Sequence, residues 1–116
     1  PNIRWHGVLP YYQAMAHAAA SDVGLVPFGE GAITASVDPI KYYDYTAARC
    51  RTVATSAMTE LRGRKYCHLG EPGELIDAVL AAAEAPAITE AQAQAFCRAN
   101  SWNARADAIL RAAEEL

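Results

Sequence analysis

The chain has 116 residues, of which 53% are hydrophobic and 20% are charged, and its formal net charge is -3. These values suit one small domain with a real core. The acidic balance and the lack of a basic stripe exclude a protein that follows nucleic-acid phosphates. No apolar run in the sequence reaches the length of a membrane helix, so we expect a soluble, cytoplasmic protein. The three cysteines form no C-x-x-C pair, which favours reduced thiols over a disulfide frame or a zinc site.

The first part of the chain alternates between strand and helix patterns. "NIRWHGVL" at 2–9 predicts a strand, and the alanine-rich stretch at 11–22 predicts a helix. "VGLVPF" at 23–28 is almost unbroken in apolar residues, which is typical of a strand that is buried on both faces of a parallel sheet. A glycine-bearing loop is expected at 29–36.

A helix is expected to follow this loop. Asp38 is the expected N-cap of that helix, and Pro39 takes its first helical position, where a missing N–H costs nothing. The tyrosines that come next, Tyr42, Tyr43 and Tyr45, are expected to be packing residues.

The second part of the chain predicts strands at 51–55 and 65–69 and then three helices. The helices are expected at residues 73–85, 89–100 and 102–116. The first should bury the face that carries Leu75, Ile76, Val79, Leu80 and Ala83, and it should end before Pro86. Thr89 and Ser101 should cap the other two, with a simple side-chain cap at Thr89 rather than a full capping box. Strands separated by helices indicate an α/β fold with a parallel sheet.

The helix that opens at Asp38 is the candidate site. In parallel sheets, ligands bind beyond the carboxyl ends of the strands, and this helix follows such a strand. The free amides of Ile40 and Lys41 would face a phosphate at the positive end of the helix dipole. Lys41 adds a cation, and Asp44 lies three residues further along the same face. The simpler alternative is a capped surface helix whose Lys41–Asp44 pair is an ordinary exposed ion pair.

Three stretches together resemble a known family. They are "NIRWHGVLPYYQAMAHAAASDVGLVPF", "VDPIKYYDYTAARCRTVAT" and "NSWNARADAIL". Their order resembles the C-terminal, donor-binding half of GT-B glycosyltransferases that build bacterial surface polysaccharides, with the pattern P-x-K-x-x-E-Y-x-A-x-G-x-P-V. Glucuronosyltransferases of exopolysaccharide synthesis are among the relatives that it suggests. The resemblance implies a partial Rossmann-like domain over residues 1–116, with the acceptor domain and the first part of the nucleotide domain absent.

The resemblance also implies roles for individual residues. Lys41 and its neighbours Pro39 and Ile40 would meet the nucleotide diphosphate, and Asp44, in place of the usual glutamate, would bind the ribose. The turn from Val8 to Tyr11, which includes Leu9 and Pro10, would lie against the nucleobase. Ser36 stands where many relatives carry a glutamate that contacts the donor sugar. Arg49 and Arg51 replace the family glycine and proline, either as extra phosphate contacts or as ordinary cations at a helix end.

The implied activity is transfer of a sugar from a nucleotide-diphosphate donor, expected to be a UDP-sugar, to a glycan or a lipid-linked acceptor. The sequence contains no D-x-D pair, so we expect no metal and no cofactor beside the donor. The catalytic residues are unknown, and the base is expected on the absent half, which would also supply any peripheral membrane association. The chain alone is expected to bind the donor weakly and to be inactive. The alternatives are a sugar-nucleotide epimerase of the same fold and a helix-rich interaction module.

Several single residues are given structural roles. Trp102 and Arg105 match the terminal motif of the family. On physical grounds we expect Trp102 to anchor the last helix in the core and Arg105 to pair with a carbonyl or carboxylate. His6, His17 and His68 are expected to be structural or to face solvent, without a shared ligand geometry.

Overall fold

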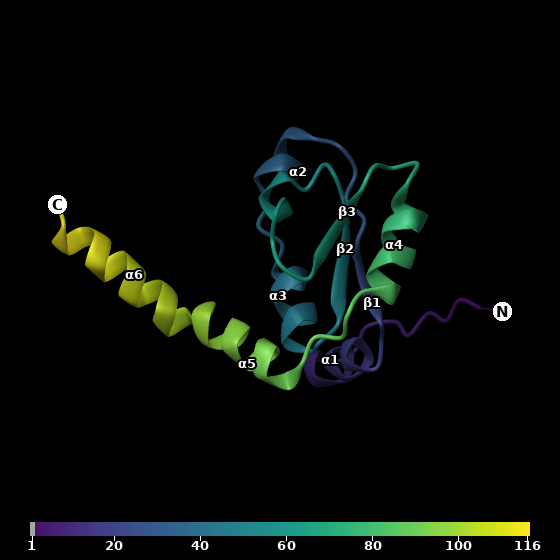
Figure 1. The fold of residues 1–116 in the computed structure, drawn as a ribbon, viewed down its shortest axis with the longest axis horizontal. Coiled ribbons are helices and arrows are strands. Elements are labelled where there is room, and N and C mark those ends of the chain that lie inside the picture. Colours follow the sequence, from purple (N-terminus) through teal and green to yellow (C-terminus); the bar gives the residue numbers. More distant parts are fainter. Residues whose placement is uncertain (1) are drawn as a thin grey trace.

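A parallel three-stranded sheet forms the centre of the molecule. The computed structural model describes residues 2–116, and Pro1 lies outside the described part. The strands β1 (Val23–Val26), β2 (Arg51–Thr55) and β3 (Cys67–Gly70) lie in the order β1-β2-β3 (Figure 1). Val23 lies opposite Arg51, and Thr52 lies opposite Cys67. The predicted α/β class and parallel sheet are therefore confirmed.

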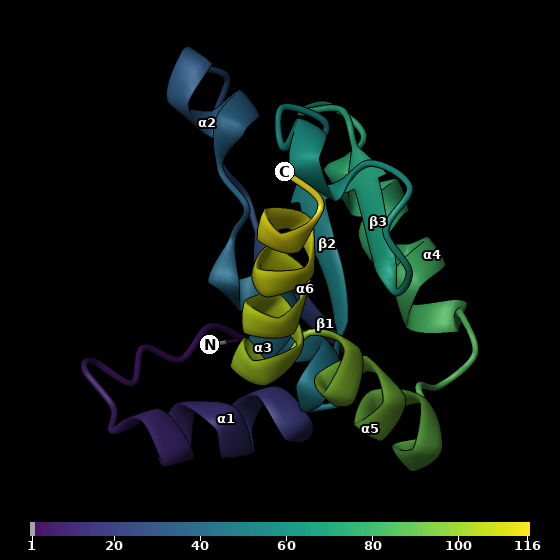
Figure 2. The same ribbon diagram turned by 90° about the vertical axis from the view of Figure 1, so that its left-hand side faces the viewer.

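Helices cover both faces of this sheet. The helical elements are α1 (Tyr11–Ala19), α2 (Ala32–Ser36), α3 (Ile40–Ala47), the 3₁₀ turn η1 (Thr59–Leu61), α4 (Leu75–Glu84), α5 (Glu90–Ala99) and α6 (Trp102–Glu114). Figure 1 shows α3 on one side of the strands, α4 on the other, and α1 at the end where the strands begin. Figure 1 shows that α6 extends away from this body, and the molecule measures 56 Å by 31 Å by 30 Å. In Figure 2, which is turned by 90°, α6 lies in front of the strands and points toward the viewer. Within residues 2–116, no helix combines the length and the apolar character needed to cross a membrane.

The core lies where β2 passes between α3 and α4. Residues 52–55 of β2 are all buried, as expected for the central strand of a parallel sheet. Ala54 packs in one cluster with Val26 from β1, Tyr42 from α3, and Met58 and Leu61 from the turn after β2. The predicted packing role of the tyrosines is confirmed, because Tyr42 is only 2% exposed and Tyr43 and Tyr45 pack against this cluster.

β1 is an edge strand, which corrects the expectation that it is buried on both faces. Its side chains alternate in burial, and Leu25 remains 47% exposed. Among the described residues, β1 pairs with β2 alone, so one row of its backbone groups has no neighbouring strand. A continuous apolar run predicted a strand correctly, but it could not specify where that strand lies in the sheet.

The strand predicted at 2–9 is wrong. These residues have no regular structure, and Ile3, Trp5 and Val8 are almost fully exposed. A strand needs a hydrogen-bonded neighbour, and none of the described strands pairs with this segment. The composition that favours a strand is present in 2–9, but no described partner strand pairs with it.

Two local predictions are also corrected. The loop expected at 29–36 contains the short helix α2, whose last residue, Ser36, bonds back to the carbonyl of Ala32. The expectation of a simple cap at Thr89 is wrong, since Gln92 lies three residues on and completes a capping box. Thr89 N–H donates to Gln92 Oε1 at 2.9 Å, and Gln92 N–H donates to Thr89 Oγ1 at 3.1 Å. Ser101 caps α6 as predicted.

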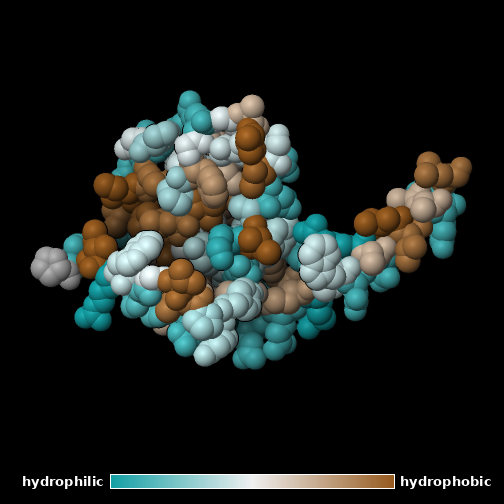
Figure 3. All heavy atoms as spheres, turned by 180° about the vertical axis from the view of Figure 1, so that it is seen from behind, coloured by the Kyte–Doolittle hydropathy of each residue, from teal (hydrophilic) through white to brown (hydrophobic). Residues whose placement is uncertain are grey.

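α4 packs on the sheet through a face that only partly matches the prediction, since Leu75 and Val79 of the predicted face are half-buried but Ile76, Leu80 and Ala83 are exposed. Ala82 is buried, Ala78 and Val79 are half-buried, while Ile76 and Leu80 remain largely exposed. Small alanines allow the helix to approach the strands closely, and the larger side chains point outward. Seen from behind, a broad hydrophobic surface lies on the side of the molecule that carries α4 (Figure 3).

Gly24 in β1 is required for the packing of α3. A β-carbon at this position would lie 2.4 Å from Tyr45 Cδ2 and 2.7 Å from its Cγ, well inside contact distance. The Tyr45 ring therefore rests directly on the strand backbone, and this close approach seats α3 on the sheet.

We expect Gly24→Ala to destabilise the protein by about 1–3 kcal/mol, since the Tyr45 ring or the whole of α3 must shift. Urea unfolding followed by circular dichroism measures the change. Gly29→Ala is the matched control, because a β-carbon there meets nothing within 4 Å. Equal effects of the two substitutions would show that the Tyr45 contact is not the cause.

Candidate functional site

The start of α3 is held by a different contact from the one predicted. Pro39 takes the N-cap position, and no side chain caps the helix. Asp38 instead accepts a hydrogen bond of 2.7 Å from the hydroxyl of Tyr43 and forms an ion pair of 3.4 Å with Arg64. The predicted N-cap role of Asp38 is therefore wrong, because Tyr43 on the helix itself and Arg64, which is distant in sequence, compete for its carboxylate.

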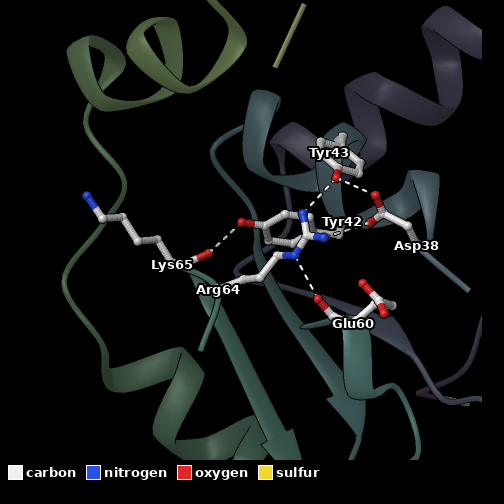
Figure 4. A network of polar contacts seen from close by, with 6 residues as sticks. All are labelled: Asp38, Tyr42, Tyr43, Glu60, Arg64 and Lys65. Carbon is white, nitrogen blue, oxygen red and sulfur yellow. Dashed lines mark hydrogen bonds and ion pairs between the residues drawn. The ribbon is translucent and has the colours of Figure 1, made fainter. Parts of the chain in front are cut away.

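Arg64 joins the start of α3 to the segment after η1 (Figure 4). Its Nη1 donates to Tyr43 Oη at 2.7 Å, and its Nε donates to the carbonyl of Glu60 at 2.7 Å. The guanidinium also lies over the rings of Tyr42 and Tyr43, 5.6 and 5.8 Å from their centres. Sequence reasoning missed Arg64, because neither its neighbours nor its spacing marks it.

Tyr42 ties α3 to the segment between η1 and β3 through a hydrogen bond. Its hydroxyl donates to the carbonyl of Lys65 at 3.0 Å, in the same network (Figure 4). Burial raises the pKa of this phenol to about 12, and the charge of Arg64 only partly offsets the rise. The network thus holds Tyr42 in its neutral, hydrogen-bonded form.

Asp44 is the meeting point of the predicted site residues. Its Oδ1 accepts a hydrogen bond of 2.9 Å from the hydroxyl of Tyr11, and its Oδ2 lies 3.4 Å from Nζ of Lys41. The hydrogen bond to Asp44 raises the pKa of Tyr11, since the carboxylate stabilises the protonated phenol. The structure therefore brings together Tyr11 from α1 and Lys41 and Asp44 from α3. Lys41 remains largely exposed, while the side chain of Asp44 is 12% exposed.

A hollow of about 490 Å³ opens beside Asp44. One wall comes from α1 and the region of α3, and it contains Tyr11, Asp38, Ile40, Tyr43 and Asp44. The second wall comes from the junction of α5 and α6, and it contains Asn100, Trp102 and Arg105. Acidic, basic and aromatic side chains from separate elements thus surround one space.

Trp102 and Arg105 differ from their predicted roles. Trp102 is 84% exposed rather than a core anchor, because α6 extends away from the sheet and offers no core there. The guanidinium carbon of Arg105 lies 5.2 Å from the centre of the Tyr43 ring. Within residues 2–116, the side chain of Arg105 makes no hydrogen bond to a carbonyl or carboxylate. Both side chains instead line the hollow.

The remaining predicted site residues lie elsewhere. Leu9 and Pro10 precede α1, where the carbonyl of Pro10 accepts hydrogen bonds from the amides of residues 13 and 14. Ser36 ends α2 and does not line the hollow. Arg49 Nε donates to the carbonyl of Ile88 at 2.8 Å, beyond the far end of α3. Arg51 at the start of β2 donates to the carbonyls of residues 22, 83 and 86. Neither arginine faces Lys41.

The cysteines and histidines of the chain do not line the hollow. Cys50 is buried, Cys67 is half-buried and Cys97 is exposed, and all three are free thiols. Burial raises the pKa of Cys67 to about 11. The rings of His6 and His17 lie 4.4 Å apart, a proximity that the sequence did not indicate. In the described part of the chain, no three His, Cys, Asp or Glu side chains gather as metal ligands would.

Comparisons of this chain with models of protein families, with curated proteins and with solved structures find no match. Any functional assignment therefore depends on the motifs and geometry of this chain alone.

The raised pKa of Tyr42 predicts a loss of stability at high pH. The Tyr42 phenol has a pKa of 10.0 in the unfolded chain and about 12 in the folded chain. Its contribution to the free energy of unfolding is therefore fully present below pH 10. It is lost as the pH rises towards 12, because Tyr42 ionises in the unfolded chain but stays protonated in the folded one. The difference in unfolding free energy between the wild type and Tyr42→Phe should shrink by on the order of 2 kcal/mol over this interval. Urea unfolding at a series of pH values measures it, with the exposed Tyr12→Phe as the control. A constant difference would contradict the pKa shift.

Proposed function

We propose that this chain is the donor-binding part of a glycosyltransferase that takes a sugar from a nucleotide diphosphate, expected to be UDP, and transfers it to a glycan or lipid-linked acceptor. The observation that carries the proposal is the contact between Lys41 and Asp44 on α3, a helix that follows a strand of a parallel sheet. Asp44 lines the hollow, and Lys41 lies outside its lining. In this proposal the domain is the C-terminal part of a GT-B enzyme, and the active protein is cytoplasmic.

The first turn of α3 supports an anion site. The amide of Tyr42 donates a hydrogen bond to the carbonyl of Pro39, whereas the amides of Ile40 and Lys41 donate to no backbone carbonyl of the described residues. Ile40 and Lys41 are both exposed, so a phosphate can reach these donors and the positive end of the helix dipole. Because Asp38 is engaged by Arg64 and Tyr43, its carboxylate does not cap these amides.

The backbone at the end of α3 agrees with the family pattern. Arg49 adopts a φ of 65°, a left-handed conformation that favours glycine and is uncommon for other residues. The family pattern has glycine at this position. The hydrogen bond from Arg49 to the carbonyl of Ile88 helps to offset the strain of an arginine there.

Donor binding would require Lys41 to exchange partners. Its ammonium group now pairs with Asp44, and in the proposal it turns to the diphosphate, while Asp44 and Tyr11 meet the ribose hydroxyls. Lys41 and the helix dipole would then stabilise the charge that develops on the departing nucleotide diphosphate. No residue of this chain is assigned as the catalytic base.

The second candidate function is that of a non-catalytic interaction module, and the exposure of α6 favours this function. No residue of this 13-residue helix is buried, and Ile109 and Leu110 are largely exposed. In this alternative, the Lys41–Asp44 contact is an ordinary surface ion pair, and nucleotide binding is not expected.

Calorimetric titration of the 116-residue chain with UDP tests the proposal. We expect weak, saturable binding that Lys41→Ala weakens by about 1–3 kcal/mol, as for the loss of a charge-assisted hydrogen bond. Lys65→Ala is the matched control, since Lys65 is an exposed lysine that lies outside α3 and forms no ion pair with Asp44. Absence of UDP binding to the folded chain would contradict the proposal and favour the interaction module.

A further inference from the structure

Trp102 and Arg105 line the hollow on the side of α6, and the proposed function gives these two side chains no part in donor binding. Trp102 stands at the first position of α6, 84% exposed and facing the same space as Asp44. Ser101 fixes the start of this helix, because its hydroxyl accepts a hydrogen bond of 3.1 Å from the amide of Ala104. The indole is therefore presented at the hollow by a capped helix end rather than by an irregular loop.

The two carboxylates around the hollow each have a cationic partner, but Arg105 has no carboxylate partner among the described residues. Asp44 is paired with Lys41, and Asp38 is paired with Arg64, so both carboxylates are neutralised by a cation. Arg105 lies over the Tyr43 ring, and among the described residues it has no carboxylate partner. The hollow thus has one unmatched positive charge beside an exposed aromatic face.

A ligand that satisfies both features has a flat ring and a negative group. Aromatic side chains bind nucleobases by stacking, and arginine binds phosphate through a planar fork of donors. A plain sugar would leave the charge of Arg105 unmatched, and inorganic phosphate would leave the indole uncovered. A nucleotide carries both parts in one molecule.

We propose that Trp102 and Arg105 form the second half of the nucleotide site, in which the indole stacks on the base and the guanidinium binds a phosphate. This inference rests on the proposed function and assigns the terminal W-x-x-R segment to donor binding. The donor would then lie between α3 and the start of α6, and it would hold the two elements together.

Fluorescence tests the stacking directly. The chain has two tryptophans, so Trp5→Phe leaves Trp102 as the only indole. In that background, we expect UDP to quench the fluorescence of Trp102 in a saturable way, with the same midpoint as in calorimetry. We expect Trp102→Ala to weaken UDP binding by about tenfold or more. Because Trp102 is exposed, the substitution should leave the circular dichroism spectrum unchanged.

The charge is tested separately with Arg105→Gln. We expect this variant to weaken the binding of UDP and of pyrophosphate about tenfold, and Arg105→Lys to restore part of the affinity. Pyrophosphate has no ring to stack, so Trp102→Ala should leave its affinity unchanged. Arg111→Gln, on the same helix but outside the hollow, is the matched control and should bind UDP like the wild type.

The outcomes separate this inference from the proposed function. UDP binding that depends on Lys41 but leaves Trp102 fluorescence unchanged, with unaltered affinity in Trp102→Ala and Arg105→Gln, would overturn the inference alone. Absence of UDP binding to the folded wild type would overturn the proposed function, and this inference with it. Quenching that saturates with UDP, and whose midpoint rises about tenfold in Arg105→Gln but not in Arg111→Gln, would support it.

Discussion

The guanidinium of Arg64 determines where α3 begins. It contacts Asp38, Tyr43 and the carbonyl of Glu60 and lies over two aromatic rings, so it ties the first turn of α3 to the turn that follows β2. Because these contacts engage Asp38, the helix begins without a side-chain cap and leaves its first amides open. The exposed helix start, the position of Asp44 and one wall of the hollow all depend on this arrangement.

The sequence predicts the elements that local chemistry determines. β2 has the predicted bounds, since a β-branched stretch between turns has few alternatives, and the caps at Thr89 and Ser101 use side chains close to the amides that they satisfy. The Lys41–Asp44 contact follows from helical spacing alone. These features need no knowledge of how distant segments meet.

The features that the sequence does not predict depend on contacts between segments that are distant in sequence. The segment at 2–9 has the composition of a strand, but pairing requires a neighbour that composition cannot supply. Asp38 has the residue type and position of an N-cap, yet Arg64, distant in sequence, competes for its carboxylate. Trp102 has the size of a core residue, but whether a helix finds a core to pack on is a property of the whole fold. In the candidate site, the Lys41–Asp44 contact within α3 is therefore predictable, whereas the position of Trp102 and Arg105 beside it is not.

The open side of β1 has a consequence for handling the protein. Four residues of strand backbone lie at the margin of the sheet next to the exposed Leu25, with Phe28 just beyond. An exposed edge strand can pair with extended segments of neighbouring molecules, and this pairing leads to aggregation as the protein concentration rises. The short length of β1 and Pro27, immediately after it, limit this tendency, since proline cannot donate to a growing ladder. The exposed edge of β1 therefore favours self-association of the isolated chain, and Pro27 restricts how far a strand ladder can grow from it.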